Sequence, residues 1–250
     1  MRVLTSRARE PRLGSLTVSA SLAAVALLAI LHVSAERLRF LDAVSRSRWM
    51  SAAGGISVAY VVVHLLPELA RGQESVDAEG ILGFVEDHVY IVALIGLAVF
   101  YGVELASRRS ASRPGTMSAP FVLSMSSFAV YNGIVGYLVV HREEDTTHAL
   151  AFFVLALGLH FVVNDHALQD RHRESYQRYG RWLLIAALAI GWIAGQIAAL
   201  SEPALGLLVA FLAGGVILNV LKEELPEERQ SSFTAFVAAA AGYTVLLQLA

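Results

Sequence analysis

Three polar residues inside long apolar stretches have side chains of the types that can bind metal ions. His160 and Asn164 are four residues apart, so on a helix they share one face. Asn132 lies in the preceding apolar stretch, at a similar depth if the two stretches are antiparallel neighbouring helices. An imidazole nitrogen is a good ligand for zinc and other transition metals, and amide oxygens are weaker neutral ligands. The three residues are therefore a candidate metal site, with hydrogen bonding between helices as the alternative.

The absence of a carboxylate from this candidate site limits its chemistry. A divalent ion that has lost its water in an apolar interior needs opposing charge, and three neutral ligands supply none. Each missing carboxylate removes an interaction that is strong in a dry site. The sequence therefore predicts a low metal affinity, a different transported species, or a loss of transport.

Further ligand-type residues lie toward the ends of apolar stretches. His64 and Glu68 are four apart on one face and form a candidate entrance, although Pro67 beside an acid is also ordinary at a helix end. Acidic and imidazole groups at the ends of two other stretches form a candidate exit: Asp165, His166, Asp170, His172, Glu223 and Glu224. The alternatives to an exit are a solvated loop after the first of these stretches and, for the second, interfacial acids paired with Lys222 or Arg229.

Eight apolar stretches must position these residues. Hydrophobic residues make up 56% of the 250 and charged residues 16%, against roughly 25% charged in a soluble domain. Stretches near 20 residues long cross a hydrocarbon layer of about 30 Å, and without water only helices satisfy their backbone groups there. We expect one all-α membrane domain over 1–250 with helices at about 15–34, 49–69, 88–107, 119–141, 147–168, 181–200, 203–221 and 232–249.

The distribution of basic residues predicts how the helices are oriented. Cytoplasmic loops carry the excess of Lys and Arg. The loops after the first, third, fifth and seventh helices hold thirteen of the 19 basic residues, so we expect both termini outside the cell membrane. The basic segment 1–12 argues against this, and with Val33-Ser34-Ala35 it also imitates a secretory signal. The long apolar run and the stretches that follow favour a first anchor helix instead.

A repeated sequence pattern links the second and seventh predicted helices. The pattern of two glycines followed by Leu-Pro-Glu occurs at Gly54-Gly55 with Leu66-Pro67-Glu68, and again at Gly214-Gly215 with Leu225-Pro226-Glu227. The two copies would run antiparallel in the membrane. This indicates an inverted repeat of helices 1–3 and 6–8 around helices 4–5, as in many secondary transporters. Chance recurrence of small packing residues is the alternative.

These residues resemble the ZIP (Zrt/Irt-like) family of metal transporters. His64-Leu65-Leu66-Pro67-Glu68 looks like the end of that family's second helix, and the run from Gly214 to Glu227 is similar to its seventh. The segments 131–136 and 160–165 stand where the family has His-Asn-x-x-Asp/Glu-Gly and His-Glu-x-x-His-Glu. Asn132, His160 and Gly136 agree with the family pattern. The family's other site positions are replaced, by Tyr131, Val135, Phe161 and Asn164.

The resemblance implies a divalent metal-ion transporter of the zinc or iron type, with Asn132, His160 and Asn164 at its site. Zinc or another divalent ion would be the substrate, and neither an enzyme activity nor a cofactor is expected. The expected partners are the metal ion and the lipid bilayer, with a second copy of the chain in a homodimer as a further candidate. No basic patch with interleaved aromatics suggests nucleic-acid binding.

Two other functions were compared with transport. The replaced ligands favour a ZIP-like protein that has lost transport and acts in binding or regulation. A membrane-embedded metal hydrolase is disfavoured, because the sequence has neither the His/Glu spacing of a zincin nor a serine in a Gly-x-Ser-x-Gly context.

Overall fold

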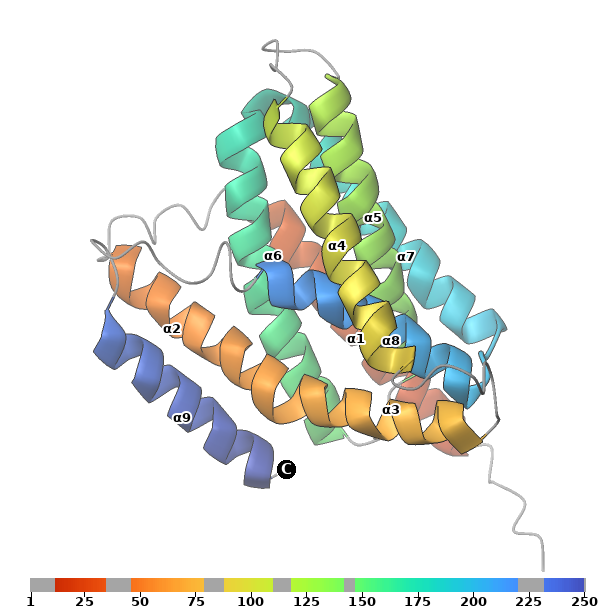
Figure 1. The fold of residues 1–250 in the computed structure, drawn as a ribbon. Coiled ribbons are helices and arrows are strands. Elements are labelled where there is room, and N and C mark those ends of the chain that lie inside the picture. Colours follow the sequence, from red (N-terminus) through yellow and green to blue (C-terminus); the bar gives the residue numbers. More distant parts are fainter. Residues whose placement is uncertain are drawn as a thin grey trace, which may run out of the picture.

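The chain folds entirely into helices over the part that the structure describes. The structure is a computed structural model that describes residues 12–34, 46–78, 88–109, 118–141, 147–219 and 232–249. The predicted all-α class is thereby confirmed. The elements, of which η2 and η3 are π-helical, are α1 (Arg12–Ser34), α2 (Arg46–Ala59), η2 (Tyr60–Leu65), α3 (Leu66–Ala78), α4 (His88–Arg109), α5 (Ala119–Val140), α6 (Thr147–Ser175), η3 (Tyr176–Gly180), α7 (Arg181–Ile197), α8 (Glu202–Asn219) and α9 (Phe233–Leu249) (Figure 1).

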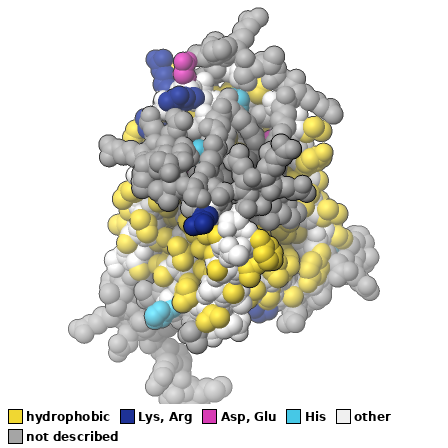
Figure 2. Space-filling model, turned by 90° about the vertical axis from the view of Figure 1, so that its left-hand side faces the viewer, with side chains coloured by type: hydrophobic (Ala, Val, Ile, Leu, Met, Phe, Trp, Pro, Cys, Tyr) yellow, Lys and Arg dark blue, Asp and Glu magenta, His cyan; other side chains and the backbone are white. Residues whose placement is uncertain are grey.

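Many of these helices have the length and composition of membrane spans. Figure 2 shows hydrophobic side chains over the sides and lower half of the visible face, charged side chains gathered near its upper edge, and further dark blue side chains near its centre and lower edge. Two apolar helices, Val18–Ser34 and Phe233–Gln248, are shorter than a full span, so the count of eight spans stays a prediction. Within the described ranges six segments are long and apolar enough to cross a membrane: Ser51–Gln73, His88–Ser107, Ala119–Val140, His148–Gln169, His172–Ile197 and Glu202–Asn219.

Two helices extend beyond the ends that the apolar pattern predicts. The second predicted span ends near residue 69, but the helix continues through α3 to Ala78. The fifth predicted span ends near residue 168, but α6 continues to Ser175 with a non-helical backbone at His172. The charged residues after 168 resemble a loop by composition, yet Gln, Arg and Glu are good helix formers, and the helix continues through them. Asp165 therefore lies within α6 rather than at its end.

A π-helical segment interrupts the second membrane helix. Pro67 has no backbone N–H, and its ring clashes with the carbonyl four residues before it. The helix stays continuous because η2 widens it, with the Leu66 N–H bonded to the Val61 carbonyl instead of the one four residues back. Widened turns of this kind occur frequently at functional sites. Here the turn carries Tyr60 and His64.

Close backbone contacts at glycines hold the helices together. α5 packs along α7, α4 crosses α8, and α2 lies beside α9 (Figure 1). A Cβ atom added at Gly136 of α5 would stand 2.1 Å from the Leu188 carbonyl oxygen of α7. One added at Gly133, a turn earlier, would be no closer than 3.7 Å to the Ala187 carbonyl oxygen. Contact between α5 and α7 therefore depends on Gly136 having no side chain.

The first testable prediction compares these two glycines. Gly136→Ala should lower the thermal unfolding midpoint of the purified protein in detergent, because overpacking against fixed backbone costs about 1–3 kcal/mol. Gly133→Ala is the matched control and should leave the midpoint unchanged or raise it, since alanine is the better helix former by about 1 kcal/mol. Equal midpoints for the two variants would contradict the described packing of α5 on α7.

Candidate functional site

His160 and Asn164 contact each other inside the helix bundle, as their spacing predicts. The Asn164 Nδ2 atom lies 2.8 Å from His160 Nε2, so the amide donates and the ring nitrogen accepts. Both side chains are buried. The ring of Tyr131 from α5 lies 5.6 Å from the His160 ring, centroid to centroid. A neutral hydrogen-bonded pair therefore occupies this face of α6.

Asn132, the third residue of the predicted site, is turned toward a different histidine. Its Nδ2 donates to the Phe128 carbonyl oxygen at 2.8 Å, which leaves Oδ1 as the atom that faces the next helix. Oδ1 lies 2.9 Å from Nε2 of His32, near the end of α1. His32 thus contacts the amide oxygen that the sequence pattern predicts beside His160 and Asn164. The expected convergence of all three residues stays a prediction.

His32 also contacts the carboxylate of Asp165. The distance from His32 Nδ1 to Asp165 Oδ2 is 2.7 Å, and each side chain is only 1% exposed. The His32 ring stacks on Phe161 with 4.7 Å between centroids. Asp165 was predicted at a helix end as part of an exit, together with His166. Instead Asp165 is fully buried, and His166 is half-buried one residue further along.

The contacts of His32 determine how its hydrogen bonds run. Because Asn132 presents an oxygen, the ring must donate to it from Nε2. The Nδ1 atom and the Asp165 oxygen then share one further proton, whichever atom holds it. The pair is therefore neutral overall, which suits an interior where an isolated charge is very costly. The other carboxylate oxygen, Asp165 Oδ1, accepts no hydrogen bond within the described residues.

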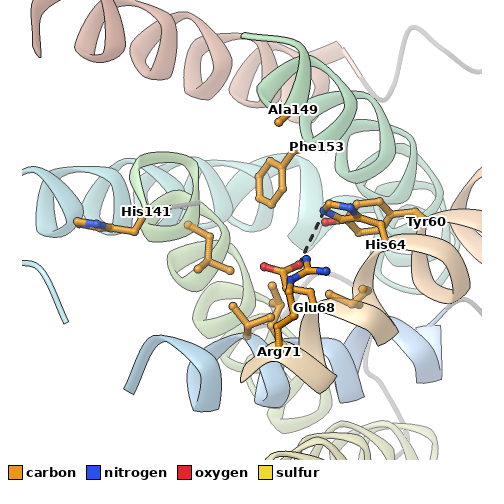
Figure 3. A pocket seen from close by; sticks show the side chains of 11 residues that line it. Tyr60, His64, Glu68, Arg71, His141, Ala149 and Phe153 are labelled. Carbon is orange, nitrogen blue, oxygen red and sulfur yellow. Dashed lines mark ion pairs between the residues drawn. The ribbon is translucent and has the colours of Figure 1, made fainter. Parts of the chain in front are cut away.

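A pocket of about 50 Å³ opens where the five helical segments η2, α3, α5, α6 and α8 meet. His64 and Glu68 line it from η2 and α3, with 3.8 Å between Nε2 and Oε2, and both side chains are partly exposed (Figure 3). An adjoining pocket of about 110 Å³ shares Glu68 and is also lined by Glu202 of α8. The first pocket is lined by Tyr60, His64, Leu65, Glu68, Arg71, Leu138, His141, Ala149, Phe153, Val209 and Leu212.

His141 lines the same pocket but is held by other groups. Its Nε2 lies 2.8 Å from the Gly195 carbonyl oxygen, and its ring stacks on Tyr137. In Figure 3 it lies apart from His64 and Glu68. Across the described ranges, no three His, Asp or Glu side chains are grouped so that they could hold a metal ion. His64 and Glu68 are thus the two ligand-type residues that come together at the pocket.

The remaining residues of the predicted exit are only partly described. Glu223 and Glu224 lie outside the described residues, as does the side chain of Asp170. His172 stands edge-on to Phe121 with 5.5 Å between ring centroids. The structure therefore joins His32 to the polar interior and leaves the exit undefined. A single histidine near the end of an apolar stretch was the only sequence signal for His32.

The second testable prediction concerns the His32–Asp165 pair. Asp165→Ala should destabilise the protein by about 1–3 kcal/mol, because it leaves the buried Nδ1 atom of His32 without its hydrogen-bond partner. Glu174→Ala on the same helix is the control, since this carboxylate is exposed and its loss should change stability by less than about 0.5 kcal/mol. The measurement is thermal unfolding in detergent. An Asp165→Ala protein as stable as Glu174→Ala would show that the pair does not hold the bundle.

Comparisons with known proteins give no family for this chain. No family model, no curated protein and no solved structure matches it. The resemblance to ZIP transporters therefore stays a prediction from the motif residues, and the site has to be interpreted from its own geometry.

Proposed function

We propose that this chain is a membrane transporter for divalent metal ions with a ZIP-like helix arrangement. This proposal is supported chiefly by the course of α5 and α6. One face of each helix lines the pocket, and the same face carries buried polar residues further along the helix. Leu138 and Phe153 line the pocket. Tyr131 lies seven residues before Leu138, and His160 lies seven residues after Phe153. Seven residues are two helical turns, or about 10 Å, on the same face.

The pocket has the size and chemistry of an entrance for an ion. About 50 Å³ admits a few water molecules, so an ion could enter while still partly hydrated. His64 and Glu68 offer an imidazole nitrogen and a carboxylate oxygen, both of which bind zinc, and Arg71 adds a positive charge to the same lining. The excess of basic residues in the loops at the opposite ends of the helices predicts that this mouth faces the outer side of the membrane.

Glycine contacts support the inverted repeat that the proposal assumes. A Cβ atom at Gly55 would lie 2.3 Å from the Phe236 carbonyl oxygen of α9. One at Gly214 would lie 2.0 Å from the Ala93 carbonyl oxygen of α4. Both copies of the glycine pattern therefore press against the third helix of the opposite half. An inverted repeat would produce this equivalence, and transporters of that type bind substrate between the halves.

The third testable prediction is metal uptake through the pocket. Proteoliposomes with the purified protein should accumulate zinc faster than empty ones. Glu68→Gln and His64→Ala should raise the KM for zinc, by about tenfold for each ligand interaction worth about 1.4 kcal/mol. Asn132→Ala and His160→Ala should lower the rate. Glu174→Gln, which removes an exposed carboxylate elsewhere, is the matched control and should transport like the unaltered protein. Equal zinc accumulation with and without the protein would remove the proposal.

A second candidate function is supported by the packing of the interior. Tyr131 and Phe161 replace a histidine and a carboxylate of the ZIP pattern, and their rings lie 6.2 Å apart, 0% and 1% exposed. These aromatic side chains fill the space where that pattern has ligands. The corresponding function is a ZIP-like membrane protein that no longer transports and acts in binding or regulation.

The fourth testable prediction separates this candidate from transport. A protein without a transport site should purify without bound metal and should give no uptake in proteoliposomes. Elemental analysis of the purified protein is the direct measurement. Stoichiometric zinc that is lost on His160→Ala exchange would rule the second candidate out.

A further inference from the structure

His32 joins three helices through groups that a cation would otherwise use as ligands. Its ring lies between the Asp165 carboxylate of α6, at 2.7 Å, and the Asn132 amide oxygen of α5, at 2.9 Å. Carboxylate and amide oxygens are the ligand types that suit magnesium, calcium and manganese ions. Both oxygens are buried beside the seam of α5 and α6 that the proposed transport path would follow.

The partners of His32 adjoin the second polar cluster. Asn132 follows Tyr131, whose ring contacts His160, and Asp165 follows Asn164, whose amide donates to His160. Asp165 is the only buried acidic side chain among the residues that the structure describes. Its oxygen Oδ1 is buried without a hydrogen-bond partner in the same set. The carboxylate thus lies next to the predicted site but is directed to His32.

We propose that His32 is a specificity-determining residue that takes up the Asp165 carboxylate and the Asn132 amide oxygen and so withholds them from hard divalent cations. The inference rests on the proposed function, because it concerns which ions the same seam accepts. With the His32 ring in place, the ligand-type groups left to an ion between α5 and α6 are the neutral side chains of His160 and Asn164. Without the ring, the buried Asp165 carboxylate loses its imidazole partner and faces a vacated space with the Asn132 amide oxygen at its far side. A hard cation such as Mn²⁺ fits that need.

Two conservative exchanges separate the two contacts of the ring. In His32→Asn the amide N–H stands where Nδ1 stands, so the contact with Asp165 is kept. In His32→Gln the amide reaches the place of Nε2, so Asn132 keeps its donor while Asp165 loses its own. The inference therefore assigns opposite results to these two variants, whereas a purely structural role for His32 would not distinguish them by metal affinity.

The fifth testable prediction is Mn²⁺ binding to the purified proteins, followed by electron paramagnetic resonance of the free ion. His32→Ala and His32→Gln should bind one more Mn²⁺ per chain than the unaltered protein, with a Kd at least about tenfold lower than any site there. His32→Asn should bind like the unaltered protein. The double variant His32→Ala with Asp165→Asn should lose the additional ion. In proteoliposomes, Mn²⁺ should compete with zinc uptake by His32→Gln but not by His32→Asn.

The outcomes distinguish this inference from the proposed function. No additional Mn²⁺ in folded His32→Ala, or an additional ion that persists in the double variant, would overturn the inference. If His32→Ala does not fold, the comparison of His32→Gln with His32→Asn decides, and equal Mn²⁺ binding by these two overturns it. Binding to purified protein requires no transport, so an unaltered protein without zinc uptake would remove the proposed function and leave the binding result standing.

Discussion

Polar groups buried in a membrane protein must satisfy one another, because lipid and packed side chains offer them no water. In this chain His32 meets part of that requirement, because it connects α1 to α5 and α6 through Asn132 and Asp165, while Asp165 Oδ1 has no hydrogen-bond partner among the described residues. The three side chains form one hydrogen-bonded unit that carries no net charge. A lone aspartate at the same place would carry a large desolvation cost. The position of α1 in the bundle and the neutrality of the interior thus depend on the same contact.

The backbone contacts at glycines set how closely the helices approach, and so which faces meet. Gly136 allows α5 to lie directly against α7, while Gly55 and Gly214 do the same for the pairs α2 with α9 and α4 with α8. Once these pairs are fixed, the remaining faces of α5 and α6 turn toward the pocket and the polar interior. Gly136 in this way fixes the position of α5, the helix that carries Asn132, against α7.

The sequence predicts the contacts that form within one helix, but it does not predict the contacts that need several helices to pack together. The all-α class follows from the apolar stretches, and the His160–Asn164 contact follows from a spacing of four. The orientation of Asn132 could not be predicted, because it depends on a histidine 100 residues away that arrives by tertiary packing. The depth of Asp165 was missed for a similar reason. The charged residues after 168 resemble a loop, but α6 continues to Ser175 and keeps Asp165 inside.

The same helices, α5 and α6, form a tightly packed interior around His160 and line an open pocket at one end. Tyr131, Phe161 and His160 are all buried, so on the proposed function an ion that entered at His64 and Glu68 would advance only if the segments around these residues shifted. Packed cores change between discrete arrangements rather than deforming continuously. The π-helical turn next to Pro67 is where the second membrane helix already departs from regular bonding, and it carries His64. Deeper in the bundle, the proposed path adjoins the contacts of His32 with Asp165 and Asn132. The proposed path therefore has an irregular π-helical backbone at its mouth and a buried hydrogen-bonded network of side chains inside the bundle.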